Sequence, residues 1–164
     1  MVRAESQGMV AERLAFEASI EPLLEPAFRL ALTLSGDRQE AEDVLQDATL
    51  RAWRSWAQLR DMTAVRAWYL RIVANQCRSA RRRRWASVLR LERPPVYVPQ
   101  PDPDELADLR SALRRLERGD RAVLVLHYLA DMPLPEVAAV LGLRPAGAKT
   151  RLYRALEKLR KELA

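Results

Sequence analysis

Half of the ten prolines of this 164-residue chain lie in one short segment, residues 90–104, which reads RLERPPVYVPQPDPD. Proline fixes the backbone φ angle and removes an amide donor, so a segment this rich in proline favours extended, semi-rigid chain. On both sides of it, apolar residues recur at helical spacing. The pattern therefore predicts two small domains, residues 10–89 and 105–164, joined by a proline-rich linker at residues 90–104.

Helical periodicity runs through nearly the whole sequence outside this linker. In the first part, apolar residues mark helical regions over residues 16–34, 41–53 and 65–80, and Pro22 and Pro26 are expected to kink or divide the first of them. The helices expected in the second part are residues 105–117, 121–129, 134–141 and 145–162. No run alternates convincingly as a strand would, so the sequence predicts an all-α protein made of two small helical domains.

Two residues mark the boundary between the first two helical regions. Gly36 is suited to the left-handed conformation that ends many helices. Asp37 follows it and can cap the next helix by accepting a hydrogen bond from a free backbone N–H group. We therefore expect one helix to end at Gly36 and another to begin directly after Asp37.

Charge is segregated along the chain, which carries a net charge of +6. Residues 60–90 hold nine arginines against a single acid, and residues 144–161 hold seven basic side chains against a single acid. In contrast, residues 37–47 hold five acids against one arginine. Two basic segments and one acidic segment indicate at least two kinds of partner, of which nucleic acid is one.

Several classes of site are excluded by composition. Cys77 is the only cysteine and His127 the only histidine, so neither a disulfide nor a Cys/His zinc site can form within the chain. The acids at residues 40–47 lack the glycine turn of a calcium loop, and no phosphate-binding glycine loop or nucleophile motif is present. We therefore predict no metal, no cofactor and no enzymatic activity.

A location in the cytoplasm is also predicted. No apolar run approaches the length needed to cross a bilayer, so we expect no membrane insertion. The first residues, MVRAESQGMVAERL, lack the apolar stretch of a signal peptide.

The clearest local motif lies at residues 133–160, PLPEVAAVLGLRPAGAKTRLYRALEKLR. A short helix is expected to end at Gly142, and a longer one to begin near Pro145, which together form a helix-turn-helix. In such a motif the second helix enters the major groove, where residues near its N-terminus reach base edges and later basic residues reach phosphates. The alternative is a solvated basic helix in a bundle. The predicted outward, DNA-binding residues are Lys149, Thr150, Arg151, Tyr153, Arg154 and Lys158.

Three motifs in this order resemble those of extracytoplasmic-function (ECF) sigma factors, the smallest group of bacterial sigma factors. They are EAEDVLQDATLRAWRSW at residues 40–56, RAWYLRIVANQCRSARRRR at residues 66–84, and the helix-turn-helix. The resemblance covers residues 10–163. It implies two helical domains, called sigma two and sigma four, that bind core RNA polymerase and direct it to the minus-ten and minus-thirty-five promoter elements for DNA melting and transcription initiation. The alternative is a stand-alone helix-turn-helix regulator that binds duplex DNA without polymerase.

The resemblance gives the acidic helix at residues 40–56 a role in binding polymerase. The side opposite its apolar face carries a stripe of polar and apolar residues at i, i+3, i+4 and i+7, a combination that suits a protein partner better than DNA. In the family this surface docks on the largest polymerase subunit. The alternative is a soluble helix whose acids favour its N-terminal end. The predicted polymerase-binding residues are Asp43, Gln46, Asp47 and Leu50.

The resemblance gives the arginine-rich helix, and the loop before it, a role in reading the melted minus-ten element. Arginines can hold phosphates of the non-template strand but do not distinguish sequences, whereas the amide of Asn75 can pair with the polar edge of an exposed base. The alternative is a solvated asparagine in a nonspecific basic patch. The predicted minus-ten residues are Leu59, Arg60, Met62 and Thr63 in the loop, and Arg71, Asn75, Arg78 and Arg82 on the helix.

Other features leave alternatives open. Trp53, Trp56, Trp68 and Tyr69 are candidates for stacking on unpaired bases, although the positions of Trp53 and Trp68 on apolar stripes favour core packing. His127 suits either a phosphate contact or a satisfied, partly buried histidine.

The resemblance predicts neither the promoter sequence nor the identity of an anti-sigma factor. The recognition helix departs from the family pattern at Gly147, where a threonine is usual, so the preferred promoter is not predicted. Many family members are held inactive by an anti-sigma factor. The resemblance admits one as a partner here, although no residue identifies it.

Overall fold

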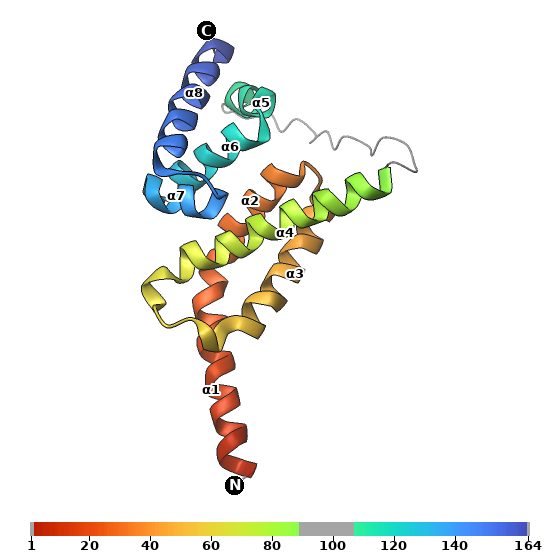
Figure 1. Cartoon of the computed structure of the whole chain (residues 1–164), viewed down its shortest axis with the longest axis vertical. Coiled ribbons are helices and arrows are strands. Elements are labelled where there is room, and N and C mark those ends of the chain that lie inside the picture. Colours follow the sequence, from red (N-terminus) through yellow and green to blue (C-terminus); the bar gives the residue numbers. More distant parts are fainter. Residues whose placement is uncertain (1, 89–106, 164) are drawn as a thin grey trace.

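The computed structural model describes residues 2–88 and 107–163, and every regular element in these two ranges is helical (Figure 1). The first range contains α1 (Val2–Ile20), η1 (Glu21–Leu23), α2 (Leu24–Ser35), α3 (Arg38–Ser55), η2 (Trp56–Gln58), η3 (Met62–Ala64) and α4 (Val65–Val88). The second contains α5 (Ala107–Arg115), α6 (Arg118–Leu124), the π-helical turn η4 (Val125–Leu129), α7 (Leu134–Leu141) and α8 (Pro145–Leu163). The predicted all-α fold is confirmed. The predicted linker, residues 90–104, lies outside the described residues.

The helix boundaries follow local signals in the sequence. Pro22 lies in η1, the short 3-10 turn that divides α1 from α2. Gly36 ends α2 with a φ of 77°, and its N–H donates to the carbonyl oxygen of Leu32. The Asp37 carboxylate accepts a hydrogen bond of 2.8 Å from the backbone N–H of Glu40, which caps α3. The predicted division at proline, helix end and helix cap are all confirmed.

The first domain is built on α2, α3 and α4, which pack against one another. The inner face of α3 is lined by fully buried alanines, and such small side chains let neighbouring helices approach closely. From α4, the ring of Tyr69 is fully buried, and its hydroxyl lies 2.7 Å from the hydroxyl of Thr49 on α3. Burial raises the pKa of this phenol, so it stays neutral and joins the two helices by a hydrogen bond.

Only the last turns of α1 join this core. Phe16 and Ile20 are buried, and the Phe16 ring meets Trp56 edge-on with the ring centroids 5.2 Å apart. Met9, Val10 and Leu14, nearer the N-terminus, are exposed. Figure 1 shows the N-terminal half of α1 projecting away from the other helices.

The second domain contains the predicted helix-turn-helix. Gly142 ends α7 in the left-handed conformation, with a φ of 67°, and Pro145 begins α8. The two helices pack against each other and α6 packs against α8, so that Val137 and Leu152 are buried between them. Figure 1 shows α8 crossing the ends of the shorter α6 and α7.

The helix predicted at residues 121–129 is divided. It continues from α6 into η4, where the N–H of Ala130 donates to the carbonyl oxygen of Val125, five residues earlier, over 3.0 Å. Asp131 follows with a positive φ of 49°, and the turn directs Met132 into the core, where it is 1% exposed.

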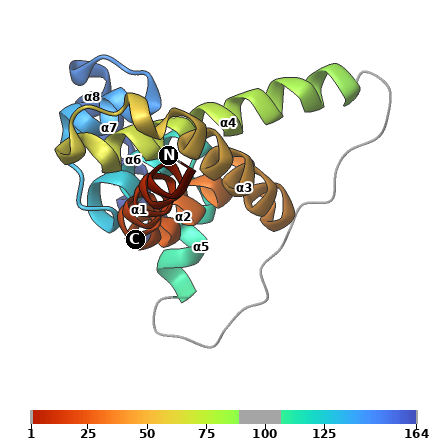
Figure 2. The same cartoon turned by 90° about the horizontal axis from the view of Figure 1, so that it is seen from below.

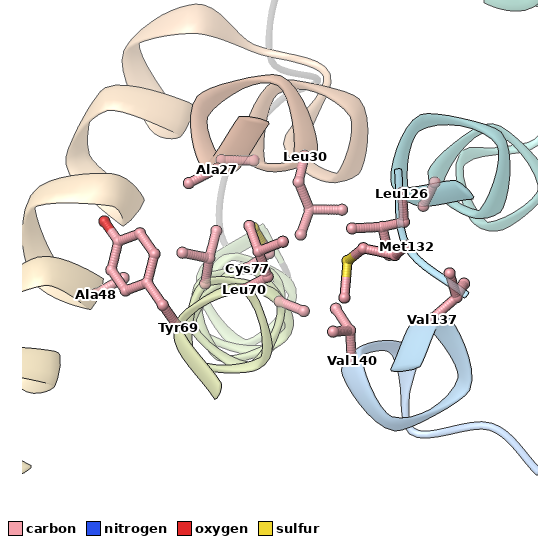
Figure 3. Close-up of a cluster of buried hydrophobic side chains, with 14 of the residues drawn as sticks. Ala27, Leu30, Ala48, Tyr69, Leu70, Cys77, Leu126, Met132, Val137 and Val140 are labelled. Atoms are coloured by element: carbon pink, nitrogen blue, oxygen red, sulfur yellow. The ribbon is translucent and has the colours of Figure 1, made fainter. Parts of the chain in front are cut away.

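The two domains pack on each other and share one hydrophobic core. Helix α2 contacts α6 and η4, and α4 contacts α7. Figure 3 shows Leu126, Met132 and Val140 of the second domain facing Leu30 and Leu70 of the first. Burying a side chain of this size contributes about 1.5–3 kcal/mol, so the contact adds to the stability of this closed arrangement. The view from below in Figure 2 shows α6 and α7 against the helices of the first domain while the C-terminal part of α4 extends away.

Candidate nucleic-acid and protein interfaces

The predicted polymerase-binding residues lie on one exposed face of α3. Asp43, Gln46, Asp47 and Leu50 are all exposed, opposite the buried Ala48. Within the described ranges, the side chains of Asp43, Gln46 and Asp47 have no hydrogen-bond or ion-pair partner. An acidic face without internal partners is available for a basic surface of another molecule.

Leu50 extends this face into an apolar groove between α1 and α3. Its side chain is 55% exposed, and it lines the groove together with Met9, Val10, Phe16 and Trp53. The acids of α3 therefore border an exposed apolar surface. Such a combination is typical of sites that bind other proteins.

The loop before α4 is ordered by one carboxylate. Asp61 accepts hydrogen bonds from the backbone N–H and the hydroxyl of Thr63, at 2.9 and 2.6 Å. These hydrogen bonds hold the pKa of Asp61 below its ordinary value. Leu59 is half-buried, whereas Arg60, Met62 and Thr63 are exposed. The structure thus gathers the four predicted residues on one short, capped turn.

The predicted stripe on α4 is only partly free. Arg71, Asn75 and Arg82 are exposed, and the Arg82 guanidinium donates to the hydroxyl of Ser79 over 3.1 Å. Arg78 is half-buried and has two hydrogen-bond partners. Its guanidinium donates to the side-chain oxygen of Asn75 over 2.5 Å and to the backbone carbonyl oxygen of Val140, in α7, over 3.3 Å.

A second arginine of α4 joins the domains, and the sequence did not single it out. The Arg66 guanidinium donates to the carbonyl oxygen of Ala130 and pairs with the Glu136 carboxylate, each at 3.3 Å. From the other side, Arg118 donates to the carbonyl oxygen of Leu34 over 3.4 Å. Polar contacts thus surround the shared apolar core.

On α8, the predicted DNA-binding residues divide into two groups. Lys149, Thr150 and Tyr153 are exposed, and the Lys149 ammonium lies 6.0 Å from the centre of the Tyr153 ring. The Thr150 hydroxyl donates to the carbonyl oxygen of Ala146. The hydroxyl oxygen can therefore still accept a hydrogen bond from another molecule. A Cβ atom added at Gly147 would have no neighbouring side chain or distant backbone atom within 4 Å. This group forms an open surface near the start of the helix.

The other three residues converge on Asp120 of α6, a residue that the sequence analysis missed. The Asp120 side chain is 1% exposed. One of its oxygens accepts from Arg154 over 2.8 Å and lies 3.9 Å from Arg151, and the other accepts from Lys158 over 2.8 Å. Burial raises the pKa of Asp120, but the hydrogen bonds and charges of Arg154 and Lys158 outweigh burial, and the net pKa is lowered.

The aromatic candidates for base stacking are mostly in the core. Trp56 and Tyr69 are buried, and Trp53 and Trp68 are half-buried and pack against the core. Core packing, which the sequence favoured for Trp53 and Trp68, is confirmed for them.

Cys77 and His127 both have packing environments. Cys77 is buried, and burial raises the pKa of its thiol to about 12. His127 donates from Nδ1 to the carbonyl oxygen of Met132 over 2.8 Å, which matches the expectation of a satisfied, partly buried histidine.

In residues 2–88 and 107–163, no three histidine, cysteine, aspartate or glutamate side chains gather as a metal site would require. No helix in the same part of the chain is both long and apolar enough to cross a bilayer.

Comparison with known proteins agrees with the geometry of both domains. Residues 20–87 match the protein-family model of Sigma-70 region 2, and residues 106–159 match the model of Sigma-70, region 4. The RNA polymerase sigma-E factor of Streptomyces coelicolor is 30% identical over 160 residues, which cover 93% of this chain and 88% of that protein. The ECF RNA polymerase sigma factor SigL of Mycobacterium tuberculosis is 31% identical over 141 residues, covering 81% of this chain and 80% of SigL. This chain belongs to the ECF RNA polymerase sigma factors.

Two solved structures share the fold of this chain. The sigma factor RpoE from Bartonella quintana, in complex with the anti-sigma factor NepR, matches with a TM-score of 0.75 and 25% identity, covering 91% of this chain and 96% of RpoE. CnrH in complex with the cytosolic domain of CnrY matches with a TM-score of 0.67 and 30% identity, covering 96% of this chain and 93% of CnrH.

The ECF sigma factor directs RNA polymerase to promoters and to transcription initiation, and its partners are core RNA polymerase and promoter DNA. Sigma factors are not enzymes, as the sequence predicted. Membership of this family decides against the alternative of a stand-alone helix-turn-helix regulator.

Proposed function

We propose that the ECF sigma factor divides its work among three surfaces. The exposed face of α3 binds core polymerase, α4 and the preceding loop bind the melted minus-ten element, and α8 binds the minus-thirty-five duplex. The observation that carries this division is the segregation of charge, with the exposed acids Asp43 and Asp47 on α3 and basic side chains on α4 and α8. Acids repel phosphates and attract a basic protein surface, while basic side chains favour DNA.

Within the first domain, the polymerase-binding residues are Asp43, Gln46, Asp47 and Leu50. Exposure of all four supports this role, as does the apolar groove beside Leu50. Mixed acidic and apolar surfaces bind proteins through a desolvated apolar centre and complementary charges around it.

The minus-ten strand is bound by Arg71, Asn75, Arg78 and Arg82 on α4 and by the Asp61-capped turn. Exposed Arg71 and Arg82 suit phosphates of the non-template strand. Asn75 suits a base edge, because its side-chain NH₂ group still offers donors when its oxygen accepts from Arg78. Leu59, Arg60, Met62 and Thr63 surround a base that is turned out of the stack. Extruding a base costs a few kcal/mol, which contacts in the turn would offset.

The minus-thirty-five duplex is bound by α8 in the major groove. Lys149, Thr150 and Tyr153 support this assignment, because they form an open surface near the helix start, where recognition helices meet base edges. Arg151, Arg154 and Lys158 add positive charge along one side of the same helix.

The closed arrangement is a resting state in which part of the DNA surface is occupied. Its support is the bond from Arg78 to the Val140 carbonyl, because a phosphate and this carbonyl compete for the same guanidinium. We further propose that the protein acts in the cytoplasm, with its polymerase and promoters. An anti-sigma factor is a proposed partner, since the similar RpoE and CnrH were solved with NepR and with the cytosolic domain of CnrY.

The experiment that tests this function is transcription by core polymerase, with and without the protein, on a library of promoter fragments. We expect transcripts from a subset of fragments that share a minus-ten and a minus-thirty-five element. The same fragments should be silent with core polymerase alone. Transcripts that do not depend on the protein, or that share no element, would contradict the proposal.

A further inference from the structure

Asp120 is the most deeply buried charged side chain that the described residues contain, and it belongs to none of the three proposed surfaces. It lies in the first turn of α6 and is 1% exposed. A buried carboxylate is costly unless it is paired and hydrogen-bonded. Its cationic partners within residues 2–88 and 107–163 all come from α8 and are Arg151, Arg154 and Lys158.

These partners are spaced so that they lie on one side of α8. Residues at i, i+3 and i+7 share one side of a helix, and this side faces α6. Lys149, Thr150 and Tyr153 are exposed and do not pair with Asp120. The six predicted DNA-binding residues of α8 are therefore not equivalent, because three lie beside the Asp120 carboxylate and three do not.

The start of α6 is shaped to receive these side chains. At Gly119, next to Asp120, an added side-chain carbon would lie 2.6 Å from the Arg151 guanidinium. Glycine at this position leaves the space that the guanidinium fills. Glu117, before the helix, adds a second acid 3.4 Å from the Lys158 ammonium.

The two charge-assisted hydrogen bonds to Asp120 fix the orientation of α8 as well as its distance from α6. Because Arg154 and Lys158 lie one helical turn apart and bind Oδ1 and Oδ2 respectively, they restrain both the rotation of α8 about its axis and its position along α6. Rotation of α8 sets the direction in which Lys149, Thr150 and Tyr153 point. A buried anion on α6 thus controls the direction of the exposed surface near the start of α8.

We propose that Asp120 is a positioning residue for minus-thirty-five recognition, which holds α8 by Arg154 and Lys158 so that Lys149, Thr150 and Tyr153 face the bases. This inference rests on the proposed function of α8. It also means that the cationic groups of Arg154 and Lys158 pair mainly with the Asp120 carboxylate and contribute less to binding DNA phosphates. Discrimination between sequences then depends on a residue that does not touch DNA.

The test uses holoenzyme assembled from core polymerase and full-length protein carrying Asp120→Asn. Binding is measured on a promoter recovered with the wild type and on the same promoter with a scrambled minus-thirty-five element, over a range of salt concentrations. We expect the preference for the intact element to fall about tenfold, a typical effect of one displaced recognition contact. We also expect binding to the scrambled promoter to become more salt-dependent, by about one unit of log–log slope for each cation that Asp120 releases to phosphates.

Glu162→Gln is the matched control, because it removes one carboxylate from the same domain, where Glu162 pairs with Arg115 over 2.7 Å. It should leave both the preference and the salt dependence unchanged. If Asp120→Asn weakens both promoters equally, in step with its melting temperature and with an unchanged salt slope, Asp120 is merely structural and the inference is wrong. Wild-type behaviour of Asp120→Asn would also overturn it.

A second variant keeps the test decisive if Asp120→Asn does not fold. Lys158→Gln removes one cation that Asp120 binds but leaves Arg154 to pair the carboxylate. We expect reduced preference with an unchanged salt slope, and a slope lower by about one unit would instead assign Lys158 to a phosphate. Failure of the proposed function is a different result, since the wild type itself would then show no preference for any minus-thirty-five element.

Discussion

Arg78 and Val140 lie 62 residues apart in the chain, yet the Arg78 guanidinium donates to the Val140 backbone carbonyl over 3.3 Å. A residue proposed to bind the minus-ten strand is therefore held by the first helix of the helix-turn-helix. Arg66 forms the parallel contact with Glu136 nearer the start of α4. For Arg78 to bind a phosphate, it must exchange this carbonyl for the new partner, which favours separation of α4 from α7.

We predict that Glu136→Lys shifts the protein toward an open form. The variant removes the ion pair with Arg66 and places like charges together, while leaving the buried Val137 and Val140 unchanged. Both partners of the pair are more than a third exposed, so the effect should be about 0.5–1 kcal/mol, or a two- to fivefold change in the ratio of open to closed molecules. Single-molecule energy transfer between dyes on the two domains measures this ratio. Glu157→Lys, which reverses an exposed charge on α8, should leave it unchanged.

A second prediction concerns the α3 face. Asp43→Lys combined with Gln46→Ala should lower the affinity for core polymerase at least tenfold, because the reversed charge repels the basic surface that Asp43 attracts. Both side chains are exposed, so the melting temperature should change little. Glu25→Lys is the control, since it reverses an exposed charge on α2 instead. If the α3 variant binds polymerase with unchanged affinity, the polymerase-binding surface lies elsewhere on the protein.

Local signals explain why much of the fold was predictable from the sequence. The end of α2 at Gly36, the cap at Asp37 and the turn at Gly142 depend on the φ preference or hydrogen bonding of single residues within a few positions. Such effects are encoded at short range. The exposed stripe on α3 was also predictable, because helical spacing alone decides which residues oppose the apolar face.

The contacts of the basic residues were not predictable in the same way. Helical spacing placed Arg154 and Lys158 outward with Lys149, but Asp120, more than thirty residues earlier, draws them to one side. Likewise, nothing near Arg66 or Arg78 indicates that α7 lies against α4. Long side chains reach partners that only the packing of distant helices brings close.

A third prediction follows from the burial of Cys77. Its thiol is buried and its pKa is raised to about 12, so the reactive thiolate is about a thousandfold scarcer near neutral pH than for an ordinary thiol of pKa 9. Alkylation of the native protein at pH 8 should be slower than that of the urea-unfolded protein by at least this factor. Mass spectrometry of quenched samples measures both rates. Equal rates would show that Cys77 is accessible in the folded protein.

A fourth prediction concerns stability in acid. The pKa of Asp120 in the folded protein lies below the ordinary value of 3.8, so its pairing with Arg154 and Lys158 stabilises the fold fully above pH 3.8. This contribution is lost as the pH falls through the lower folded value. Urea unfolding should therefore give a difference of about 1–2 kcal/mol between the wild type and Asp120→Asn at pH 6, and a smaller difference at pH 3. A difference that does not depend on pH would contradict the assignment of a charged Asp120.

The last prediction concerns Asn75. Its side-chain oxygen accepts from Arg78, and because the residue is exposed, its NH₂ group can donate to a base of the non-template strand. Asn75→Ala should therefore relax the preference at one minus-ten position and impair promoter opening, while polymerase binding and minus-thirty-five preference persist. The expected loss at the preferred base is about five- to tenfold, the effect of one hydrogen bond of about 1 kcal/mol or slightly more. Permanganate footprinting of open complexes on single-base promoter variants measures it.

Arg71→Ala provides the comparison for Asn75, because Arg71 is exposed one helical turn earlier and is assigned to a phosphate. A phosphate contact carries no sequence information, so Arg71→Ala should weaken opening on all promoter variants alike and reduce the salt dependence by about one unit. The two variants therefore separate base reading from backbone binding on the same helix. If Asn75→Ala gives the uniform loss expected of Arg71→Ala, or no loss at all, the amide does not read a base. Specificity at the minus-ten element would then lie in the turn formed by Leu59, Arg60, Met62 and Thr63.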